Sequence, residues 1–260
     1  MPEGERIMKT VEIKDVKIGE GIPKICIPLT GKTREEIIKE AEIVKNMEPD
    51  LVEWRADCYE EGANSEKRLE MLKTIHDRLD KIPLLFTFRT DKEGGSCPIT
   101  YADYVNLLEN AAKTGFADLI DVEAFFDTDR TKYLMESLKA CGAFVVASNH
   151  HFERTPSIEE MVKRLETMDS FGADILKLAV MPKSEEDLMA LLTATVMMKS
   201  RSDKPVITMS MGKTGVLSRL CGEMSGSSVT FAAGIKASAP GQIPAERMRK
   251  TLCLLHESFT

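Results

Sequence analysis

The sequence has no long hydrophobic run and no excess of positive charge, and both absences narrow what the protein can do. No stretch of the 260 residues is apolar for long enough to span a bilayer, and residues 1–10 lack the apolar core of a secretion signal. Acidic residues outnumber basic ones by 42 to 35, and this net charge of -7 argues against a broad surface for nucleic acid or anionic membranes. We therefore expect a cytoplasmic protein with no nucleic-acid partner and no membrane partner.

Cysteine is present but lacks a functional pattern. The six cysteines contain no CxxC pair, and several lie in apolar, strand-like runs; they are Cys26, Cys58, Cys97, Cys141, Cys221 and Cys253. This distribution is typical of reduced core thiols rather than of a disulfide framework or a zinc site. The chain also lacks linkers, low-complexity tracts and internal repeats, so we expect residues 1–260 to form a single catalytic domain.

Short apolar runs rich in β-branched residues recur along the chain and alternate with charged segments of helical spacing. The apolar runs predict eight strands, at 24–29, 51–56, 83–90, 119–124, 144–149, 175–180, 205–211 and 229–233. The charged segments predict helices at 33–46, 65–80, 101–113, 129–140, 157–171, 184–200, 217–223 and 244–258. Eight β/α units without a domain break predict an α/β fold, specifically a single-domain (β/α)8 TIM barrel.

An open, doubly wound sheet is the alternative architecture. Such a sheet usually carries a glycine-rich phosphate loop after its first strand, but here the segment 30–33 reads Thr-Gly-Lys-Thr, which is not GxGxxG. The barrel is therefore favoured. Residues 9–22 have alternating character and a turn that contains glycine, which predicts an N-terminal β-hairpin that closes the bottom of the barrel.

Charged residues gather at the predicted carboxyl ends of the strands, where barrels of this kind have their active sites. They are Glu53, Arg55, Arg89, Glu93, Asp121, Glu123, His150, His151, Lys177 and Arg219. Lys177 is the most informative of them because it interrupts an apolar run, and the bulkier neighbours Leu176 and Leu178 lie on the opposite face of the strand. Those neighbours would pack against helices, so Lys177 would point into the barrel. A desolvated lysine amine is a nucleophile toward carbonyls.

Histidine at a barrel strand end suits proton transfer, so His150 and His151 are both candidates. A divalent metal held by His150, Glu123 and Asp121 is disfavoured because the sequence has no dense ligand motif, and we expect no metal. Lys177 could instead be buried only to pair with an acidic residue. Residues 234–244 are small, polar and bounded by glycine and proline, which fits either a mobile loop over the barrel mouth or an ordinary surface loop.

Six motifs in order along the chain together resemble type I 3-dehydroquinate dehydratase. They are VEWRAD (52–57), FRT with EGG (88–90 and 93–95), SNHHF (148–152), Lys177, MSMG with Ser218-Arg219 (209–212), and SAPGQ (238–242). The match extends over nearly the whole chain. The resemblance implies a (β/α)8 hydro-lyase that converts 3-dehydroquinate to 3-dehydroshikimate in the shikimate pathway of aromatic amino acid biosynthesis. It also implies a homodimer and no cofactor.

The resemblance further implies a role for each matching residue. Lys177 would form a Schiff base with the C3 ketone of the substrate, and the protonated imine would act as an electron sink. His150 would move protons to and from the substrate, Glu93 would position this histidine, and Glu123 would orient it from the other side. Arg219 would pair with the substrate carboxylate. The remaining substrate-binding residues would be Glu53, Arg55, Arg89, Ser238 and Gln242.

The sequence departs from the family pattern at two positions. His151 stands where the family commonly has aspartate, so two adjacent imidazoles compete for the catalytic position and His150 is preferred. Pro28 stands where some relatives have serine. Two other functions compete with the dehydratase: a class I aldolase or transaldolase would use the same lysine and place a phosphate near residues 212–215. A sugar-acid sensor would have no reason to keep both Lys177 and His150.

Overall fold

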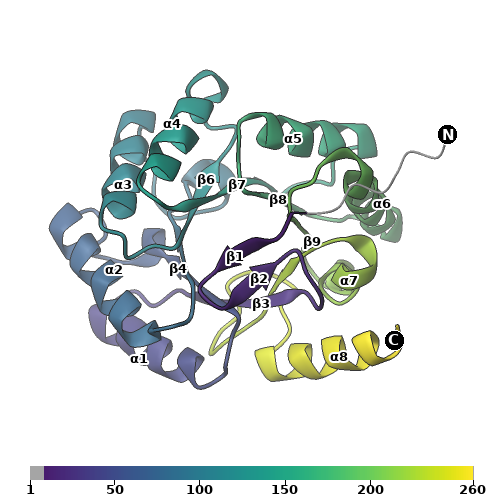
Figure 1. Cartoon of the computed structure of the whole chain (residues 1–260), viewed down its shortest axis with the longest axis horizontal. Coiled ribbons are helices and arrows are strands. Elements are labelled where there is room, and N and C mark those ends of the chain that lie inside the picture. Colours follow the sequence, from purple (N-terminus) through teal and green to yellow (C-terminus); the bar gives the residue numbers. More distant parts are fainter. Residues whose placement is uncertain (1–8, 260) are drawn as a thin grey trace.

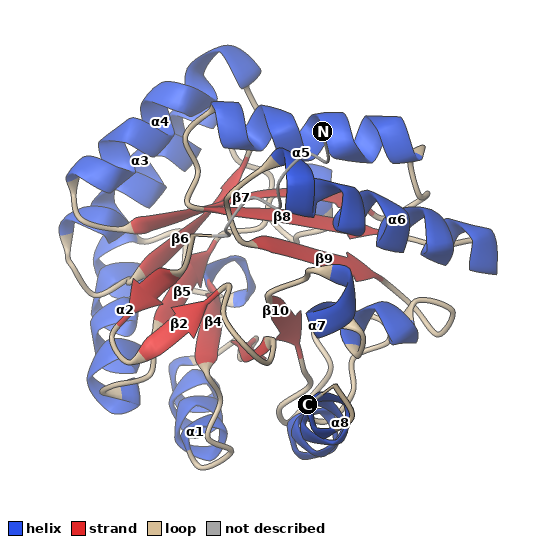
Figure 2. Cartoon of the chain, turned by 45° about the vertical axis from the view of Figure 1, so that its right-hand side comes forward, coloured by secondary structure: helices blue, strands red, loops and turns tan. Residues whose placement is uncertain are grey.

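The computed structural model describes residues 9–259, in which eight parallel strands form a barrel surrounded by helices (Figures 1 and 2). The barrel strands are β3 (Lys24–Leu29), β4 (Leu51–Arg55), β5 (Leu84–Thr87), β6 (Leu119–Glu123), β7 (Phe144–His151), β8 (Ile175–Val180), β9 (Val206–Ser210) and β10 (Val229–Phe231). β10 pairs with β3, and the sheet is closed by a parallel bridge between Val206 and Ser227. The backbone N–H of Ser228 donates to the carbonyl of Val206 at 2.7 Å across the same seam. The predicted α/β barrel is confirmed.

Helices follow the strands and pack outside them. They are α1 (Arg34–Lys45), α2 (Ser65–Leu79), α3 (Tyr101–Lys113), α4 (Thr128–Ala140), α5 (Ile158–Ser170), α6 (Glu185–Arg201), α7 (Gly222–Ser225) and α8 (Ala245–Glu257), with 3-10 turns η1 (Ala56–Cys58), η2 (Asp91–Glu93) and η3 (Val216–Arg219). Hydroxyl side chains cap the amino ends of several helices: Thr33 Oγ1 accepts from the N–H of Glu36 at 3.3 Å, and Ser157 Oγ accepts from the N–H of Glu160 at 3.2 Å.

The helix predicted at residues 217–223 is wrong as a continuous element. The chain there forms η3 and then the four-residue helix α7, which begins only at Gly222. Gly222 passes so close to the chain that a Cβ atom would lie 2.6 Å from the carbonyl oxygen of Ser227. The hydroxyl of Ser218 also accepts from the N–H of Ser210 at 2.9 Å, which holds η3 against the end of β9. Tertiary contacts therefore override the helical spacing of this segment.

The side chains of each strand divide between two separate cores. On β8, Leu176, Leu178 and Val180 belong to the core between the sheet and the helices. Ile175 and Ala179, which alternate with them, belong to the core inside the barrel. Lys177 lies on the same inward face as Ile175 and Ala179 and is only 3% exposed. The inward direction predicted for Lys177 is therefore confirmed.

The N-terminal hairpin closes the bottom of the barrel, as predicted. β1 (Val11–Ile13) and β2 (Val16–Ile18) pair in antiparallel fashion and lie across the barrel end in Figure 1. Ile13 and Ile18 pack in the same core as Leu51 and Leu119, the first residues of β4 and β6. Each fully buried aliphatic side chain of this size stabilises the fold by about 1.5–3 kcal/mol. The hairpin thus seals the end of the barrel opposite the strands' carboxyl ends.

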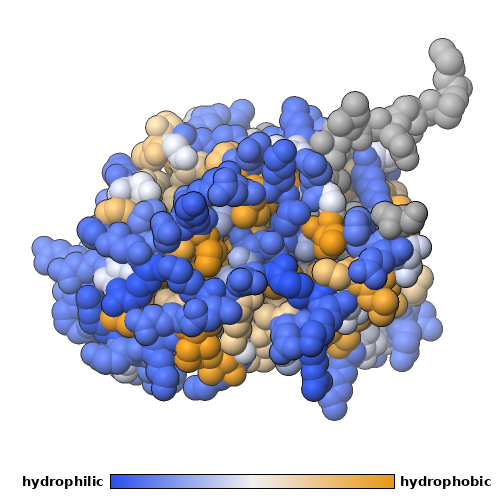
Figure 3. Space-filling model, turned by 60° about the horizontal axis from the view of Figure 1, so that its bottom comes forward, coloured by the Kyte–Doolittle hydropathy of each residue, from blue (hydrophilic) through white to orange (hydrophobic). Residues whose placement is uncertain are grey.

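The outer surface is largely hydrophilic on the face drawn in Figure 3, where hydrophobic residues form only small patches among hydrophilic ones. Within residues 9–259, no helix has both the length and the apolar character that crossing a bilayer requires.

Candidate active site

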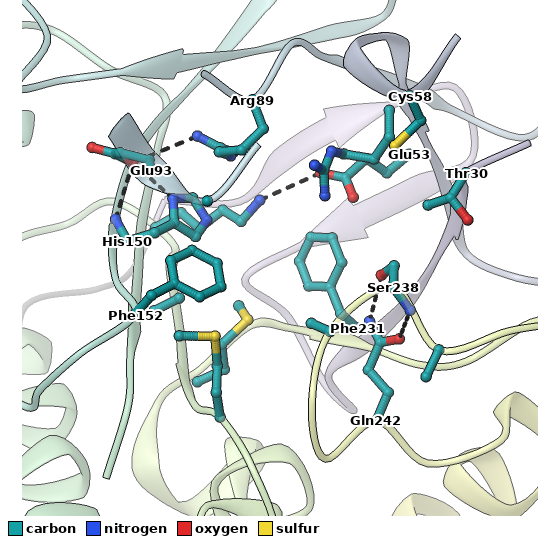
Figure 4. Close-up of a pocket in the computed structure, with 18 residues that line it drawn as sticks. Thr30, Glu53, Cys58, Arg89, Glu93, His150, Phe152, Phe231, Ser238 and Gln242 are labelled. Atoms are coloured by element: carbon teal, nitrogen blue, oxygen red, sulfur yellow. Dashed lines mark hydrogen bonds and ion pairs between the residues drawn. The ribbon is translucent and has the colours of Figure 1, made fainter. Parts of the chain in front are cut away.

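A cavity of about 310 Å³ opens at the carboxyl ends of the barrel strands. Eight of the nine site residues predicted from the sequence line it: Glu53, Arg55, Arg89, Glu93, His150, Lys177, Ser238 and Gln242. Figure 4 shows several of them converging from different strands and loops, with Phe152 and Phe231 between them. The barrel topology explains this convergence, because the ends of parallel strands remote in sequence meet at one rim.

Lys177 lines the cavity and is held by acidic partners. Its Nζ atom lies 3.1 Å from Oδ2 of Asp121 and 3.5 Å from Oε1 of Glu53. The same atom lies over the ring of Phe231, 4.5 Å from its centroid. Lys177 does pair with acidic residues, as it would if its role were only structural, but it also lines an open cavity. A ligand carbonyl can therefore reach the amine.

Arg89 links the acidic residues behind the lysine into one network. Its guanidinium donates to Oδ1 of Asp121 at 2.8 Å and to Oε1 of Glu123 at 3.2 Å. Burial of Asp121 opposes its charge, but Arg89 and Lys177 outweigh burial and lower the pKa of this carboxyl. Asp121 is fully buried and stays ionised beside the amine. The site therefore holds a fixed negative charge about one hydrogen bond from the position where an imine would form.

His150 and Glu93 form the second reactive group of the cavity. Nδ1 of His150 lies 2.8 Å from Oε2 of Glu93, and the backbone N–H of His150 donates to the same oxygen at 3.0 Å. Asn149 Nδ2 donates to the other carboxyl oxygen at 2.8 Å. Glu93 can be so placed because η2 ends at Gly94, whose φ of +83° is in the left-handed region that favours glycine. The contact at Nδ1 leaves Nε2 as the ring nitrogen available to a ligand.

Burial shifts the two members of this pair in opposite directions. It lowers the pKa of His150 well below the ordinary value of 6.5, and the nearby cations of Arg89 and Lys177 add to the effect. It also raises the pKa of Glu93, against the opposing charge of Arg89. Burial thus penalises the charge on each group, and the ring of His150 stays neutral at physiological pH. A neutral imidazole is the form that can accept a proton.

The two adjacent histidines have different surroundings. His150 lines the cavity, whereas His151 does not, because successive residues of β7 point to opposite faces. Burial and the charges of Arg164 and Arg154 lower the pKa of His151 to about 4. Nε2 of His151 has no hydrogen-bond partner among the described residues. The geometry therefore favours His150 over His151 for any chemistry in the cavity.

Glu123 does not contact His150 in the way that the family resemblance implied. Its carboxylate accepts from the hydroxyl and the backbone N–H of Thr90, both at 2.7 Å, and from Arg89. The orienting residue on the other side of the Glu93–His150 pair is instead Asn149, through the hydrogen bond to Glu93. Glu123 supports the site through Arg89.

The polar residues around the rest of the cavity are held by partners of their own. The guanidinium of Arg55 donates two hydrogen bonds to the carboxylate of Asp57, at 2.8 and 2.7 Å. This bidentate pairing fixes the orientation of the guanidinium plane. The backbone N–H of Ser238 donates to Gln242 Oε1 at 2.7 Å, and Gln242 Nε2 donates back to Ser238 Oγ at 2.9 Å. These two bonds close the 234–244 loop on itself beside the cavity (Figure 4).

Arg219 is the one predicted site residue that does not line the cavity. It is 2% exposed, and its guanidinium donates to the carbonyls of Phe231 at 3.4 Å and Pro240 at 3.1 Å. Within residues 9–259 its Nε has no hydrogen-bond partner and no carboxylate pairs with it. Burial lowers its pKa to about 10. Arg219 is thus a buried cation, next to the loop that borders the cavity, without a neutralising charge.

Sequence reasoning missed several residues that shape the cavity. Asp57 was seen only as part of a motif, although its buried carboxylate positions both Arg55 and the backbone N–H of Arg89. Met209 and Met211 also line the cavity and were likewise seen only as part of a motif, whereas Phe231 reads as an ordinary strand residue in the sequence. A period-two analysis of the last two strands could have found them, since all three share the inward face. Within the described part of the chain, no cluster of three or more histidine, cysteine or acidic side chains could hold a metal ion.

A barrel whose cavity contains both a lysine nucleophile and a neutral histidine defines a class of enzyme that works through its own amine. The chain belongs to the type I 3-dehydroquinase family, whose model matches residues 25–259. It is 47% identical over 252 residues to the 3-dehydroquinate dehydratase of Bacillus subtilis, covering 96% of this chain and 99% of that protein. Family membership leaves no support for the aldolase and sensor alternatives.

Solved structures agree with this assignment. A crystal structure of type I 3-dehydroquinate dehydratase from Clostridium difficile, which contains covalently modified comenic acid, has a TM-score of 0.94. Its sequence is 44% identical to this chain, and the match covers 97% of this chain and 100% of that one. The 3-dehydroquinate dehydratase of Geobacillus kaustophilus has a TM-score of 0.93 at 37% identity, covering 96% of this chain and 97% of that one.

Proposed function

We propose that this protein dehydrates 3-dehydroquinate to 3-dehydroshikimate through a Schiff base on Lys177, as a hydro-lyase of the shikimate pathway. The observation that carries the proposal is the position of Lys177, buried in an open cavity beside Asp121 at 3.1 Å and on the same rim as His150. The Clostridium difficile relative, with its covalently modified ligand, supports covalent chemistry in this family. Lys177 itself supplies the electron sink, so the reaction needs neither a metal nor another cofactor.

The covalent step begins with addition of the Lys177 amine to the C3 ketone, and loss of water gives an imine. In its protonated form the imine withdraws electrons from C2. Asp121, which stays ionised, lies where it can stabilise the positive charge on the imine nitrogen. Hydrolysis of the imine after elimination returns the amine and releases the product ketone.

His150 carries out the proton transfers of the elimination. As the neutral ring, it removes the C2 proton through Nε2, and it then returns a proton to the hydroxyl that leaves C1 as water. Glu93 positions His150, since its Oε2 accepts from the ring and from the backbone N–H of the same residue. The net change is the loss of one water molecule from the substrate, which balances without an oxidant or a reductant.

Substrate recognition follows from the charges that the protein itself leaves unpaired. We assign the substrate carboxylate to Arg219, because Arg55 and Arg89 are already ion-paired whereas Arg219 has only carbonyl partners among the described residues. Arg219 does not line the cavity in this structure, so the carboxylate would have to displace the carbonyl of Pro240, which belongs to the loop beside the cavity. Glu53, Arg55, Arg89, Ser238 and Gln242 line the cavity and would bind the substrate hydroxyls and support the carboxylate.

The test of the proposed function is the appearance of the conjugated enone product, followed by absorbance, when the purified protein is mixed with 3-dehydroquinate. Turnover should be abolished in Lys177→Met, which keeps much of the side-chain volume but removes the amine. His150→Ala should nearly abolish turnover, whereas the matched variant His151→Ala should keep most of it. Unchanged turnover in Lys177→Met would overturn the proposal, and the opposite result for the two histidines would reverse their assignment.

We further propose that residues 1–260 act as one catalytic domain and that the protein is a cytoplasmic homodimer. The resemblance to the family supports the dimer, and the acidic balance of 42 to 35 charges supports a location away from membranes. Light scattering coupled to gel filtration should give twice the chain mass of 29.0 kDa. A single-chain mass would contradict the dimer, and recovery of the protein in the membrane fraction of cells would contradict the location.

A further inference from the structure

A second cavity of about 350 Å³ lies outside the barrel wall, between α2 and α3. Its walls come from both helices, from η1, and from the segment around Cys97. It shares no lining residue with the catalytic cavity, although Asp57 lines this second cavity and the next residue, Cys58, lines the catalytic one. The two cavities are therefore separate spaces on either side of η1.

Arg68 lines this cavity as a buried arginine whose hydrogen-bonding groups are only partly satisfied within residues 9–259. It is 6% exposed, and its Nη1 atom donates to the carbonyl of Gly62. Its Nε atom is buried and has no hydrogen-bond partner within residues 9–259. No carboxylate in that part of the chain lies within ion-pair distance of it, and burial alone lowers its pKa. A buried guanidinium left in this state has unsatisfied donors, which is costly unless an anion completes them.

The local backbone adds to the positive potential. Arg68 lies in the first turn of α2, which begins at Ser65, and Ser65 also lines the cavity. The amino end of a helix of this length carries a partial positive charge that favours anions. Helix and guanidinium therefore point to the same kind of ligand.

Two acidic residues line the same cavity, and both are engaged elsewhere. Asp57 binds Arg55 at 2.8 and 2.7 Å and accepts the backbone N–H of Arg89 at 3.1 Å. Asp103 is exposed and accepts from the hydroxyl of Thr100 at 2.7 Å. Neither neutralises Arg68. The lining also has apolar residues, among them Phe88, Ile99 and Leu107.

We propose that this cavity is a binding site for a small organic carboxylate with an apolar body. The carboxylate pairs with Arg68 at the start of α2, and the apolar body packs against Phe88 and Leu107. A volume of 350 Å³ is in the range of small-molecule pockets. Inorganic phosphate satisfies only the charge and leaves the apolar residues uncovered, so it binds less tightly.

Isothermal titration of the full-length enzyme with phenylacetate tests this site. We expect saturable 1:1 binding to the wild type, and binding about tenfold weaker or more in Arg68→Met because the charge-assisted hydrogen bonds are lost. The matched control is Arg219→Met, which removes another buried arginine that has no ion pair within residues 9–259. Binding should be unchanged in that variant, and saturating 3-dehydroshikimate should not displace the probe.

A second comparison does not depend on the folding of Arg68→Met. Benzyl alcohol has the same apolar ring without the charge, and inorganic phosphate has the charge without the ring; both should bind the wild type at least about tenfold more weakly than phenylacetate. Equal binding of benzyl alcohol would overturn the role of Arg68, and equal binding of phosphate would overturn the role of the apolar residues. Absence of saturable phenylacetate binding, or its loss in Arg219→Met, would overturn the site.

Discussion

Glu93→Gln replaces the buried carboxyl group that positions His150 while keeping the shape of the side chain. Glu93 accepts three hydrogen bonds, two from His150 at 2.8 and 3.0 Å and one from Asn149 at 2.8 Å. A glutamine has one accepting oxygen and one donating NH2 group, so at least one donor must face another donor. A buried donor that is left without an acceptor costs about 1–3 kcal/mol. We therefore expect kcat to fall by roughly 5- to 150-fold.

The effect of Glu93→Gln should appear in kcat rather than in KM. Lys177 keeps Asp121 at 3.1 Å and Glu53 at 3.5 Å in this variant, so imine formation should be largely preserved. The absorbance assay gives kcat and KM, and borohydride trapping gives the fraction of enzyme that forms the imine. The matched control is Glu160→Gln, because Glu160 pairs with Arg154 and Arg164 outside the cavity and its loss should leave kcat unchanged.

A double-mutant cycle separates positioning from any direct role of Glu93. If Glu93 acts through the ring, Glu93→Gln should cost little further activity in a His150→Ala background. A kcat of the single variant within about threefold of the wild type would refute the positioning argument, since about 1.4 kcal/mol corresponds to tenfold. Full additivity of the two substitutions would refute it as well.

Three further predictions concern the fold and the pH dependence. Ile18 is 0% exposed at the end of the barrel that the N-terminal hairpin closes, so Ile18→Ala should lower the free energy of unfolding by about 2–5 kcal/mol and leave kcat unchanged. Urea titration measures the stability and the absorbance assay measures kcat; a stability loss under about 1 kcal/mol would contradict the role of the hairpin. Gly94→Ala should lower the free energy of unfolding by about 1–3 kcal/mol and lower kcat, because Gly94 has φ +83° and an added Cβ would lie 2.8 Å from Cδ2 of Phe152. A stable, fully active variant would contradict this prediction and show that the loop adapts to the added methyl group. In the free enzyme, burial lowers the pKa of His150 below 6.5, so the neutral ring persists as pH falls and the acidic limb of the pH profile of kcat/KM should lie below pH 6.5. A half-maximal point at or above 6.5 would contradict the neutral buried base.

The fold was largely predictable because its signals are periodic and local. All eight predicted strands are present, and the two-residue period on β8 was enough to turn Lys177 inward. Barrel topology then brought the ends of distant strands to one rim, so His150 and Lys177 could be placed together without knowledge of a single contact. The segment 217–223 was the exception, since the close approach of Gly222 to Ser227 is a tertiary event.

The contacts inside the site could not be predicted in the same way. The sequence places Asp121, Glu123 and Arg89 at neighbouring strand ends but does not say which carboxylate binds which cation. In the structure Asp121 accepts a hydrogen bond from Lys177, whereas Glu123 accepts one from Thr90, although the two acidic residues lie on the same face of one strand. Arg219 shows the same limit, because its burial behind the loop depends on the carbonyls of Phe231 and Pro240.

The central claim is that Lys177 forms the covalent bond to the substrate. Incubation with 3-dehydroquinate and sodium borohydride, followed by peptide mass spectrometry, tests it directly, because reduction converts the imine into a stable secondary amine. We predict one modified peptide, the one that contains Lys177, with a mass increase equal to the bound ketone less one oxygen atom, and loss of activity in proportion to the modification. Rapid turnover with no adduct on Lys177, or an adduct on another lysine, would contradict the account.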